Sequence, residues 1–281
     1  MCRLFGFRSV IPSQVHRSLL DAENALGRQS NAHPDGWGVA YYLQDTPHVT
    51  KSASRALGDA LFHRLSGVVA SETVVAHVRK ATVGDISVLN CHPFQFGRWI
   101  FAHNGEIPGF AEQREKFLGE IDPALRRYVL GDTDSEVIFH LLLTELNRFA
   151  KPTSVVTLGD CIRRTIDTVQ RLWEAPDSTS KLLLTVMITN GSSMLAYRFG
   201  KELHYSTYKT RCSDRDSCAS LSPECEAPSL SGRVNHMIIS SEPLLGENVW
   251  HELPDQELIG VDESMMLVAK PSQQNKLPVL A

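Results

Sequence analysis

The cysteine at position 2 and the Asn-Gly pair at positions 104 and 105 carry groups suited to attack on a carboxamide. Removal of Met1 would leave Cys2 with a thiol and a free α-amine on one Cα. The amine has a usual pKa of ~7.7–8, so it can serve as the base that activates the thiol. Thiol attack creates an oxyanion, which the side-chain amide of Asn104 and the backbone N–H of Gly105 can stabilise.

Arg79 and Asp134 carry the two charges that would recognise an amino-acid substrate. Arg79 can bind an α-carboxylate bidentately, and Asp134 can pair with an α-ammonium group. Considered alone, Arg79 fits a surface charge and Asp134 fits a helix N-terminus. His77 and His103, within apolar runs, fit hydrogen-bonded core positions. Only the combination with Cys2 favours a catalytic site.

Buried strands are expected to position these groups. Residues 73–79 and 99–103 are apolar runs that each end in polar side chains, and strand ends are common places for ligand contacts. Asn104–Gly105 is typical of a turn after the second run. The two glycines that flank Trp37 indicate backbone that turns or comes close to another segment.

The remaining patterns predict an α+β fold. Helices are expected over residues 13–29, 59–69 and 154–173, and a capping pattern at Thr133 and Glu136 predicts another helix start. Strands are expected over residues 4–11, before a turn at Pro12 and Ser13, and over 39–43, 182–189, 193–199, 202–208 and 234–240, with short runs near Leu258 and Met265. We expect one domain spanning residues 1–281, with a long flexible surface loop at 209–231.

Composition excludes several function classes. The 281 residues carry a net charge of −4, which does not favour nucleic acid or an anionic membrane as a partner. The sequence lacks an apolar run near the ~20 residues of a membrane span, and a secretory signal is not expected. The six cysteines are expected to be reduced in the cytoplasm. The spacing of Cys212, Cys218 and Cys225 matches no standard zinc site, so we expect neither a metal nor a cofactor.

Five motifs together make the sequence resemble a known family. It resembles the glutaminase domain of class II glutamine amidotransferases, within the N-terminal-nucleophile hydrolase superfamily. The motifs follow the family's order and spacing, most firmly in the first half of the chain: Met1-Cys2-Arg3, Pro34-Asp35-Gly36-Trp37-Gly38, His77-Val78-Arg79-Lys80-Ala81-Thr82, His103-Asn104-Gly105 and Thr133-Asp134-Ser135-Glu136.

The resemblance implies a four-layer αββα sandwich with Cys2 at the start of a central strand. It implies Cys2 as the nucleophile and its amine as the base, with an oxyanion hole formed by Asn104 and Gly105. The substrate-binding residues that it implies are Arg79 for the α-carboxylate and Asp134 for the α-ammonium, together with His77, Trp37 and Gly38 from the matching motifs.

One departure from the family bears on the reaction. Glucosamine-phosphate synthase-like members carry Trp directly after the matching Arg, whereas this chain has Lys80. The chain also lacks a Gly-rich phosphate loop. Both points favour a stand-alone branch, which includes the γ-glutamyl amide hydrolase of ergothioneine biosynthesis. The leading hypothesis is hydrolysis of glutamine or a γ-glutamyl compound through a Cys2 thioester. A glutaminase subunit that supplies ammonia to a separate synthetase and a non-catalytic glutamine-binding regulator are the alternatives.

Overall fold

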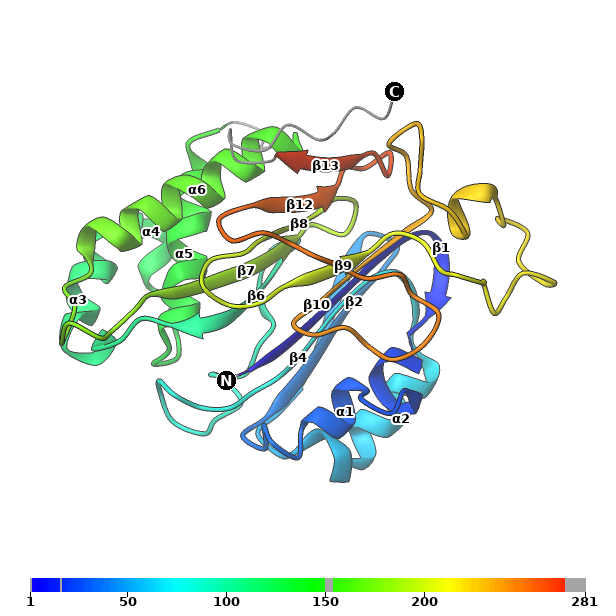
Figure 1. The fold of residues 1–281 in the computed structure, drawn as a ribbon. Helices are drawn as coiled ribbons and strands as arrows, with labels where there is room; N and C mark the ends of the chain where they lie inside the picture. Colours follow the sequence, from blue (N-terminus) through cyan, green and yellow to red (C-terminus); the bar gives the residue numbers. More distant parts are fainter. Residues whose placement is uncertain (1, 16, 150–153, 271–281) are drawn as a thin grey trace.

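In this computed structural model, which describes residues 2–15, 17–149 and 154–270, two antiparallel sheets lie face to face between layers of helices (Figure 1). Over those ranges the first sheet has the order β11-β9-β10-β1-β4-β2-β3, and the second has the order β13-β12-β8-β7-β6-β5. The strands of the first sheet are β1 (Arg3–Gln14), β2 (Trp37–Leu43), β3 (Thr46–Ser52), β4 (Ala70–Val78), β9 (His204–Ser206), β10 (His236–Ser240) and β11 (His251–Glu252). Those of the second are β5 (Phe94–Phe96), β6 (Trp99–Glu106), β7 (Leu183–Thr189), β8 (Met194–Tyr197), β12 (Leu258–Val261) and β13 (Leu267–Lys270).

Helices cover the outer face of each sheet (Figure 1). The first sheet is covered by α1 (Leu26–Gln29) and α2 (Ala60–Val68). The second sheet is covered by α3 (Phe110–Glu120), α4 (Pro123–Arg126), α5 (Asp134–Asn147) and α6 (Val155–Leu172). Short helical turns lie in the connections at Arg17–Asp21, Ala56–Gly58 and Pro223–Cys225.

Side chains point alternately to the two faces of each strand, and they fill three hydrophobic cores between these four layers. On β1, Leu4 belongs to the core between the sheets, and Phe5 faces the helices outside the first sheet. On β6, Ala102 faces the first sheet, and Phe101 stacks on Phe139 of α5 with ring centroids 5.2 Å apart. The α+β fold and the four-layer αββα sandwich are therefore confirmed.

The long helix expected over residues 13–29 is wrong, and so is the turn at Pro12 and Ser13. β1 continues to Gln14, and Ser13 pairs with Ser71 of β4 after a shift in register. The irregular stretch accommodates Pro12, which has no N–H to give to a sheet. Pairing with β4 thus overrides the helical spacing of the apolar residues at the start of this range. The short turn at Arg17–Asp21 and α1 then take the place of one long helix.

Three predicted helix starts are confirmed by their caps. The side chain of Asp59 accepts from Leu61 N at the start of α2, and Ser154 accepts from Thr157 N at the start of α6. At α5, Thr133 Oγ1 accepts from the Glu136 N–H at 3.2 Å. Glu136 does not return the contact to Thr133, because its carboxylate accepts from the N–H groups of residues 130 and 131.

The polar stretch at residues 209–231 forms bends and one 3-10 turn. Cys225 is buried, and Asn235 Nδ2 donates to its sulfur at 3.1 Å. Arg215 forms an ion pair with Glu226 across the stretch. Within the described ranges, no group of three or more His, Cys, Asp or Glu side chains is arranged to hold a metal ion. The flexibility of the stretch stays a prediction.

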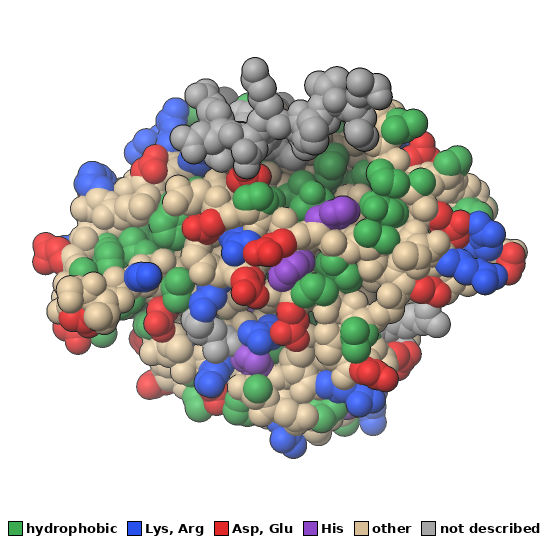
Figure 2. Space-filling view, viewed as in Figure 1, with side chains coloured by type: hydrophobic (Ala, Val, Ile, Leu, Met, Phe, Trp, Pro, Cys, Tyr) green, Lys and Arg blue, Asp and Glu red, His purple; other side chains and the backbone are tan. Residues whose placement is uncertain are grey.

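Acidic and basic side chains are interspersed over the face shown in Figure 2. This mixture agrees with the near balance of 28 Lys and Arg against 32 Asp and Glu residues in the sequence. Among the helices of the described ranges, none is both long enough and apolar enough to cross a lipid bilayer.

Candidate active site

Cys2 lies directly before β1, which β10 and β4 flank within the first sheet. Its side chain is 9% exposed. The N–H of Lys80 donates to Cys2 Sγ at 3.4 Å, and the thiol donates to the Lys80 carbonyl oxygen at 3.5 Å. The main chain that follows β4 therefore holds the thiol in place.

The surroundings of Cys2 keep its thiol protonated near neutral pH. Burial raises the pKa of the Cys2 thiol above its usual value, and the charge of Asp134 acts in the same direction. The hydrogen bond from Lys80 and the charge of Arg79 oppose this rise. A buried, protonated thiol needs a nearby base when it attacks. The charges of Arg79 and Asp134 both act on Cys2, so the two residues share its electrostatic environment.

Asn104 lies on the face of β6 that points toward the first sheet, like Ala102 two residues earlier. Its Nδ2 donates to Ser241 Oγ at 3.2 Å. The same oxygen accepts the backbone N–H of Leu4 at 2.9 Å. Leu4 is two residues from Cys2, so Ser241 brings the Asn104 amide to the start of the strand that follows Cys2. Asn104 Oδ1 is buried and has no hydrogen-bond partner among the described residues.

The turn expected at Asn104 and Gly105 is wrong, because β6 continues through both to Glu106. Gly105 pairs with Leu184, and a Cβ at this position would overlap the carbonyl oxygen of Leu183. Glycine is therefore required by the close approach of the β7 backbone. The role of the Gly105 N–H as an oxyanion donor stays a prediction.

Arg79 directly follows β4 and is 2% exposed. Its guanidinium donates to three backbone carbonyls, at distances of 2.8, 2.9 and 3.1 Å: those of Asp85, Val83 and Gly84. A guanidinium has five N–H groups, so these contacts leave two donors for a ligand. Arg79 thus organises the loop beside it, and its remaining donors are the Nε–H and one Nη1 hydrogen.

The Pro-Asp-Gly-Trp-Gly loop is tied to the segment around Arg79. The Asp35 N–H donates to the Arg79 carbonyl at 3.0 Å, and the Arg79 N–H donates to the Gly36 carbonyl at 2.8 Å. Asp35 Oδ2 accepts from the Ala81 N–H at 2.9 Å. These contacts flank Lys80, so they also fix the backbone that holds the Cys2 thiol.

The two glycines of this loop allow the segment that precedes β5 to approach. Gly36 has a φ of +135°, and a Cβ there would overlap Cys91 Sγ. A Cβ at Gly38 would overlap the carbonyl oxygen of His92. Trp37, between them, points to the outer core, where its indole N–H donates to Asp59 at 2.9 Å. Substrate contacts of Trp37 and Gly38 stay predictions. The contacts of the indole in the outer core give no support to a substrate contact by Trp37.

Asp134 is the first residue of α5 and is 3% exposed. Its Oδ2 accepts the Ile107 N–H at 2.7 Å, and its Oδ1 accepts the Ser135 N–H at 2.7 Å. Burial raises the pKa of the Asp134 carboxyl, and the charge of His103 and these donors oppose the rise. The helix N-terminus also favours the anion. The carboxylate is thus anchored at the junction of β6 and α5.

His77 and His103 occupy buried positions on opposite sheets. His103 Nε2 donates to the Leu183 carbonyl at 2.9 Å, and its Nδ1 lies 2.8 Å from Ser135 Oγ. His77 has no hydrogen-bond partner on either ring nitrogen among the described residues, and its ring centroid lies 4.2 Å from that of His92. Burial lowers the pKa of His77 to about 3, so its ring is neutral. A substrate contact by His77 stays a prediction.

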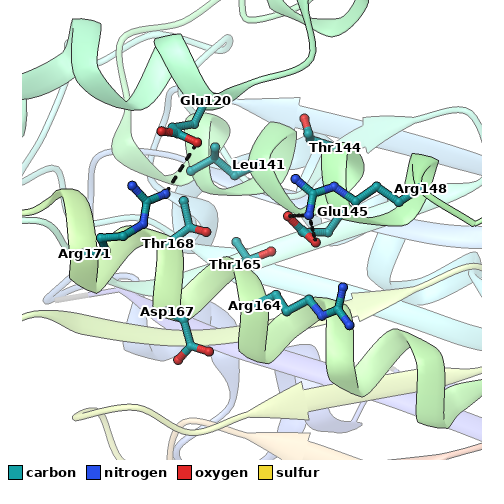
Figure 3. A pocket seen from close by; sticks show the side chains of 10 residues that line it. All are labelled: Glu120, Leu141, Thr144, Glu145, Arg148, Arg164, Thr165, Asp167, Thr168 and Arg171. Carbon is teal, nitrogen blue, oxygen red and sulfur yellow. Dashed lines mark hydrogen bonds and ion pairs between the residues drawn. The ribbon is translucent and has the colours of Figure 1, made fainter.

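A separate cavity of about 320 Å³ lies between α3, α5 and α6 (Figure 3). Two of its three arginines are paired with acids: Arg148 Nη1 lies 3.0 Å from Glu145, and Arg171 Nη2 lies 3.5 Å from Glu120. Cys2 and its partners are not among the residues that line it. The cavity is therefore distinct from the candidate active site.

The sequence model of a family described as "Glutamine amidotransferases class-II" matches residues 1–278 of this chain. The chain belongs to the class II glutamine amidotransferases. This family membership makes the chain an enzyme of the amidohydrolase type. The match includes every segment that contributes to the site described above.

Two curated relatives and a solved structure are similar to this amidotransferase over most of its length. It is 28% identical to the "Probable glutamine amidotransferase DUG3" of Saccharomyces cerevisiae, over 95% of this chain and 84% of the yeast protein. It is 26% identical to the γ-glutamyl-hercynylcysteine sulfoxide hydrolase of Mycobacterium tuberculosis, over 94% of each chain. A glutamine aminotransferase class-II domain protein from Silicibacter pomeroyi shares its fold, with a TM-score of 0.64 at 22% identity, over 96% of this chain and 98% of that chain.

Ser241 is the residue of the amidotransferase site that sequence reasoning missed. It lies just beyond β10 and contacts both Leu4 and Asn104. The available signal was the Ser-Ser pair at the end of the predicted strand 234–240. A serine after a strand is too common to indicate a site without the pairing of β10 with β1.

Proposed function

We propose that this chain hydrolyses the γ-carboxamide of glutamine, or the γ-glutamyl bond of a related compound, through a thioester on Cys2. The observation that carries the proposal is the link through Ser241, which joins the strand of the Cys2 thiol to the Asn104 amide across the two sheets. Because burial raises the pKa of the Cys2 thiol, the nucleophile depends on a local base. The α-amine that removal of Met1 would expose is that base.

The reaction proceeds in two stages. The amine accepts the thiol proton as Sγ attacks the γ-carbonyl carbon, and the carbonyl electrons form an oxyanion bound by Asn104 Nδ2 and the Gly105 N–H. When the oxyanion collapses, the C–N bond breaks, and the leaving nitrogen takes the proton from the amine. Water then attacks the thioester with the amine again as base, which releases the acid and restores the Cys2 thiol.

Arg79 and Asp134 bind the α-carboxylate and the α-ammonium group of the substrate in this proposal. The positive charge of the Arg79 guanidinium and its remaining Nε and Nη1 donors suit an α-carboxylate. Asp134 supplies the negative charge within the electrostatic environment of Cys2. Both ends of the amino-acid moiety are thereby fixed, while the γ-carbonyl lies at the thiol.

Stand-alone hydrolysis is favoured over transfer of ammonia within one chain. The match to the M. tuberculosis hydrolase covers 94% of both proteins, which supports a comparable chain organisation. The Trp of the synthase-like members is replaced by Lys80, whose side chain is exposed. We also propose that residues 1–281 act as one domain, in the cytoplasm, on a small-molecule substrate without a nucleic-acid or membrane partner.

A labelling experiment tests the proposal. A diazoketone analogue of glutamine is added to the purified protein, and intact mass spectrometry with peptide mapping locates the label. We expect a chain without Met1 that carries one label on Cys2, together with release of glutamate from glutamine or a γ-glutamyl amide. Cys2→Ala should remove both label and turnover, whereas Cys212→Ala, in the polar loop, should retain them. Full turnover by the Cys2→Ala protein would rule out the proposed mechanism.

The second candidate function is a glutaminase subunit that delivers ammonia to a separate synthetase. The similarity to a protein named as a probable glutamine amidotransferase favours it. Turnover that appears only when a co-purified synthetase is added would select this function. Turnover by the chain alone selects hydrolysis. Glutamine binding without any turnover would select a non-catalytic regulator.

A further inference from the structure

We infer that Ser241 is a positioning residue that aims the side-chain amide of Asn104 at the oxyanion and couples it to the nucleophile's strand. This inference rests on the proposed function. It assigns a role in the reaction to a residue that lies 137 positions from Asn104 in the chain. The inference follows from the way Ser241 leaves the sheet, from its hydrogen-bonding capacity and from the mobility of an unanchored amide.

At Ser241, the side-chain hydroxyl oxygen takes the place of a main-chain carbonyl oxygen as the acceptor for the Leu4 N–H. Regular pairing of β10 with β1 ends at Ser240, opposite Phe5. At the next residue, the Ser241 N–H still donates to the Leu4 carbonyl at 3.0 Å. The Leu4 N–H, however, donates to Ser241 Oγ at 2.9 Å. The hydroxyl oxygen is thereby fixed to the backbone two residues after Cys2.

The same oxygen fixes the direction of the Asn104 amide. A hydroxyl oxygen has two lone pairs, and the donors Leu4 N and Asn104 Nδ2 fill both of them. One hydrogen of Nδ2 points at Ser241, and because the amide group is planar, the direction of the second hydrogen is then set. That second hydrogen is the one available to a substrate oxyanion. Asn104 Oδ1 has no partner among the described residues that could fix the amide in its place.

Without Ser241, rotation of the Asn104 amide would be poorly restrained. The terminal torsion of an Asn side chain has a broad energy profile, so its orientation depends on hydrogen bonds. Oxyanion stabilisation requires a donor that is already directed at the developing charge. The loss of Ser241 should therefore lower kcat more than it raises KM, because Arg79 and Asp134 still bind the substrate ends.

The first variant to compare is Ser241→Ala, with Ser206→Ala as the matched control. Ser206 is also buried in the first sheet, and its hydroxyl donates to the Tyr208 carbonyl at 3.0 Å. We expect Ser241→Ala to lower kcat by about tenfold or more, short of the loss of ~100-fold or greater that follows removal of an oxyanion-hole donor itself. Its KM should stay within about twofold of the wild-type value. Ser206→Ala should change neither constant.

Two further measurements separate positioning from a general structural effect. Alkylation of Cys2 by iodoacetamide forms no oxyanion, so its rate should be unchanged in Ser241→Ala. In an Asn104→Ala background, the same change should cost nothing further, because the residue through which Ser241 acts is already absent. Equal losses in both backgrounds, or a parallel fall in alkylation and kcat, would overturn the inference.

Two safeguards keep the test decisive. If Ser241→Ala does not fold, Ser241→Thr and Ser241→Val form a pair that differs in one hydroxyl group. We then expect Thr to retain kcat and Val to lose it, and equal kcat values in the two would overturn the inference. Wild-type turnover that depends on Cys2 is measured first. Its absence would reject the proposed function itself, whereas wild-type kcat in Ser241→Ala rejects only the role of Ser241.

Discussion

Lys80 holds the sulfur of Cys2 with main-chain atoms alone, its N–H at 3.4 Å and its carbonyl oxygen at 3.5 Å. The side chain at position 80 takes no part in either contact and is exposed. A Lys can therefore stand where synthase-like members carry Trp without loss of the thiol's anchor. The position of the Cys2 thiol depends on the course of the backbone after β4, which Asp35 and Arg79 fix from the flanking positions.

Replacement of Arg79 by Ala should raise KM and also destabilise the fold. The free guanidinium donors account for the first effect, because they are the expected carboxylate ligands. The three carbonyls that the guanidinium binds account for the second, and we expect a loss of about 2 kcal/mol or more in the free energy of unfolding. Steady-state kinetics and urea titration measure the two effects.

Arg126 provides the control for this change. It also donates to backbone carbonyls, those of Ile121 and Gly119, neither of which belongs to the candidate site. Arg126→Ala should therefore leave KM unchanged. If Arg79→Ala lowers only kcat, its assigned role in binding the substrate is wrong.

Asp134→Asn should raise KM with little effect on kcat, because the charge that pairs with the α-ammonium group is removed. The Asn side chain keeps one acceptor oxygen for the Ile107 or Ser135 N–H but not for both. Stability should fall by about 1–3 kcal/mol through the unpaired donor. Asp122→Asn, at the cap of α4, should leave both kinetic constants unchanged. A fall in kcat alone would contradict the role of Asp134 in substrate binding.

Stability should fall with pH below neutrality through the buried histidines. The pKa of His77 is lowered from 6.5 to about 3 by burial, so the unfolded chain binds its proton at a higher pH than the folded chain does. The contribution of His77 to the free energy of unfolding therefore has its full value above pH 6.5 and is lost as the pH falls toward 3. By pH 5 the free energy of unfolding has fallen by about 2 kcal/mol through this group. Urea unfolding of wild type and His77→Leu at pH 7.5 and pH 5 tests this expectation. An unchanged pH dependence in the variant would exclude His77 as the cause.

Gly105→Ala should be strongly destabilising, since the added Cβ would overlap the carbonyl oxygen of Leu183. We expect a loss of about 3 kcal/mol or more, because a backbone atom of β7 cannot move without separating the two strands. Gly119→Ala is the matched control, because a Cβ at this helical position meets nothing within 4 Å. The control should be neutral or slightly stabilising, as Ala favours helices over Gly. Equal melting temperatures for the two variants would refute the steric argument.

The sequence predicted the fold class and most of the elements because their signals are local. The helix caps at Asp59, Thr133 and Ser154 lie within a few residues of the N–H groups that they bind. Most strands of the two sheets stand out as apolar runs, whereas the polar strand β3 and the two-residue strand β11 do not. The four-layer order depended on the family resemblance, since alternation along a strand does not say which sheet lies opposite.

Three of the failures share a different cause, which is pairing between distant segments. Residues 13–29 have helical spacing, yet β4 draws Ser13 and Gln14 into the first sheet. Asn104 and Gly105 have turn chemistry, yet β7 extends the pairing through both of them. In the same way, Ser241 becomes part of the site only because β10 lies beside β1. The sequence around a residue carries no signal for such a contact, because the partner segment lies far away in the chain.

The pairing of β1 with β10 also sets the order in which the candidate site can form during synthesis. Leu4 and Ser241 are separated by 237 positions, so the sheet beside Cys2 cannot be completed until Ser241 has left the ribosome. The contacts that join Leu4, Ser241 and Asn104 therefore belong to the folded chain and cannot form in its N-terminal half alone.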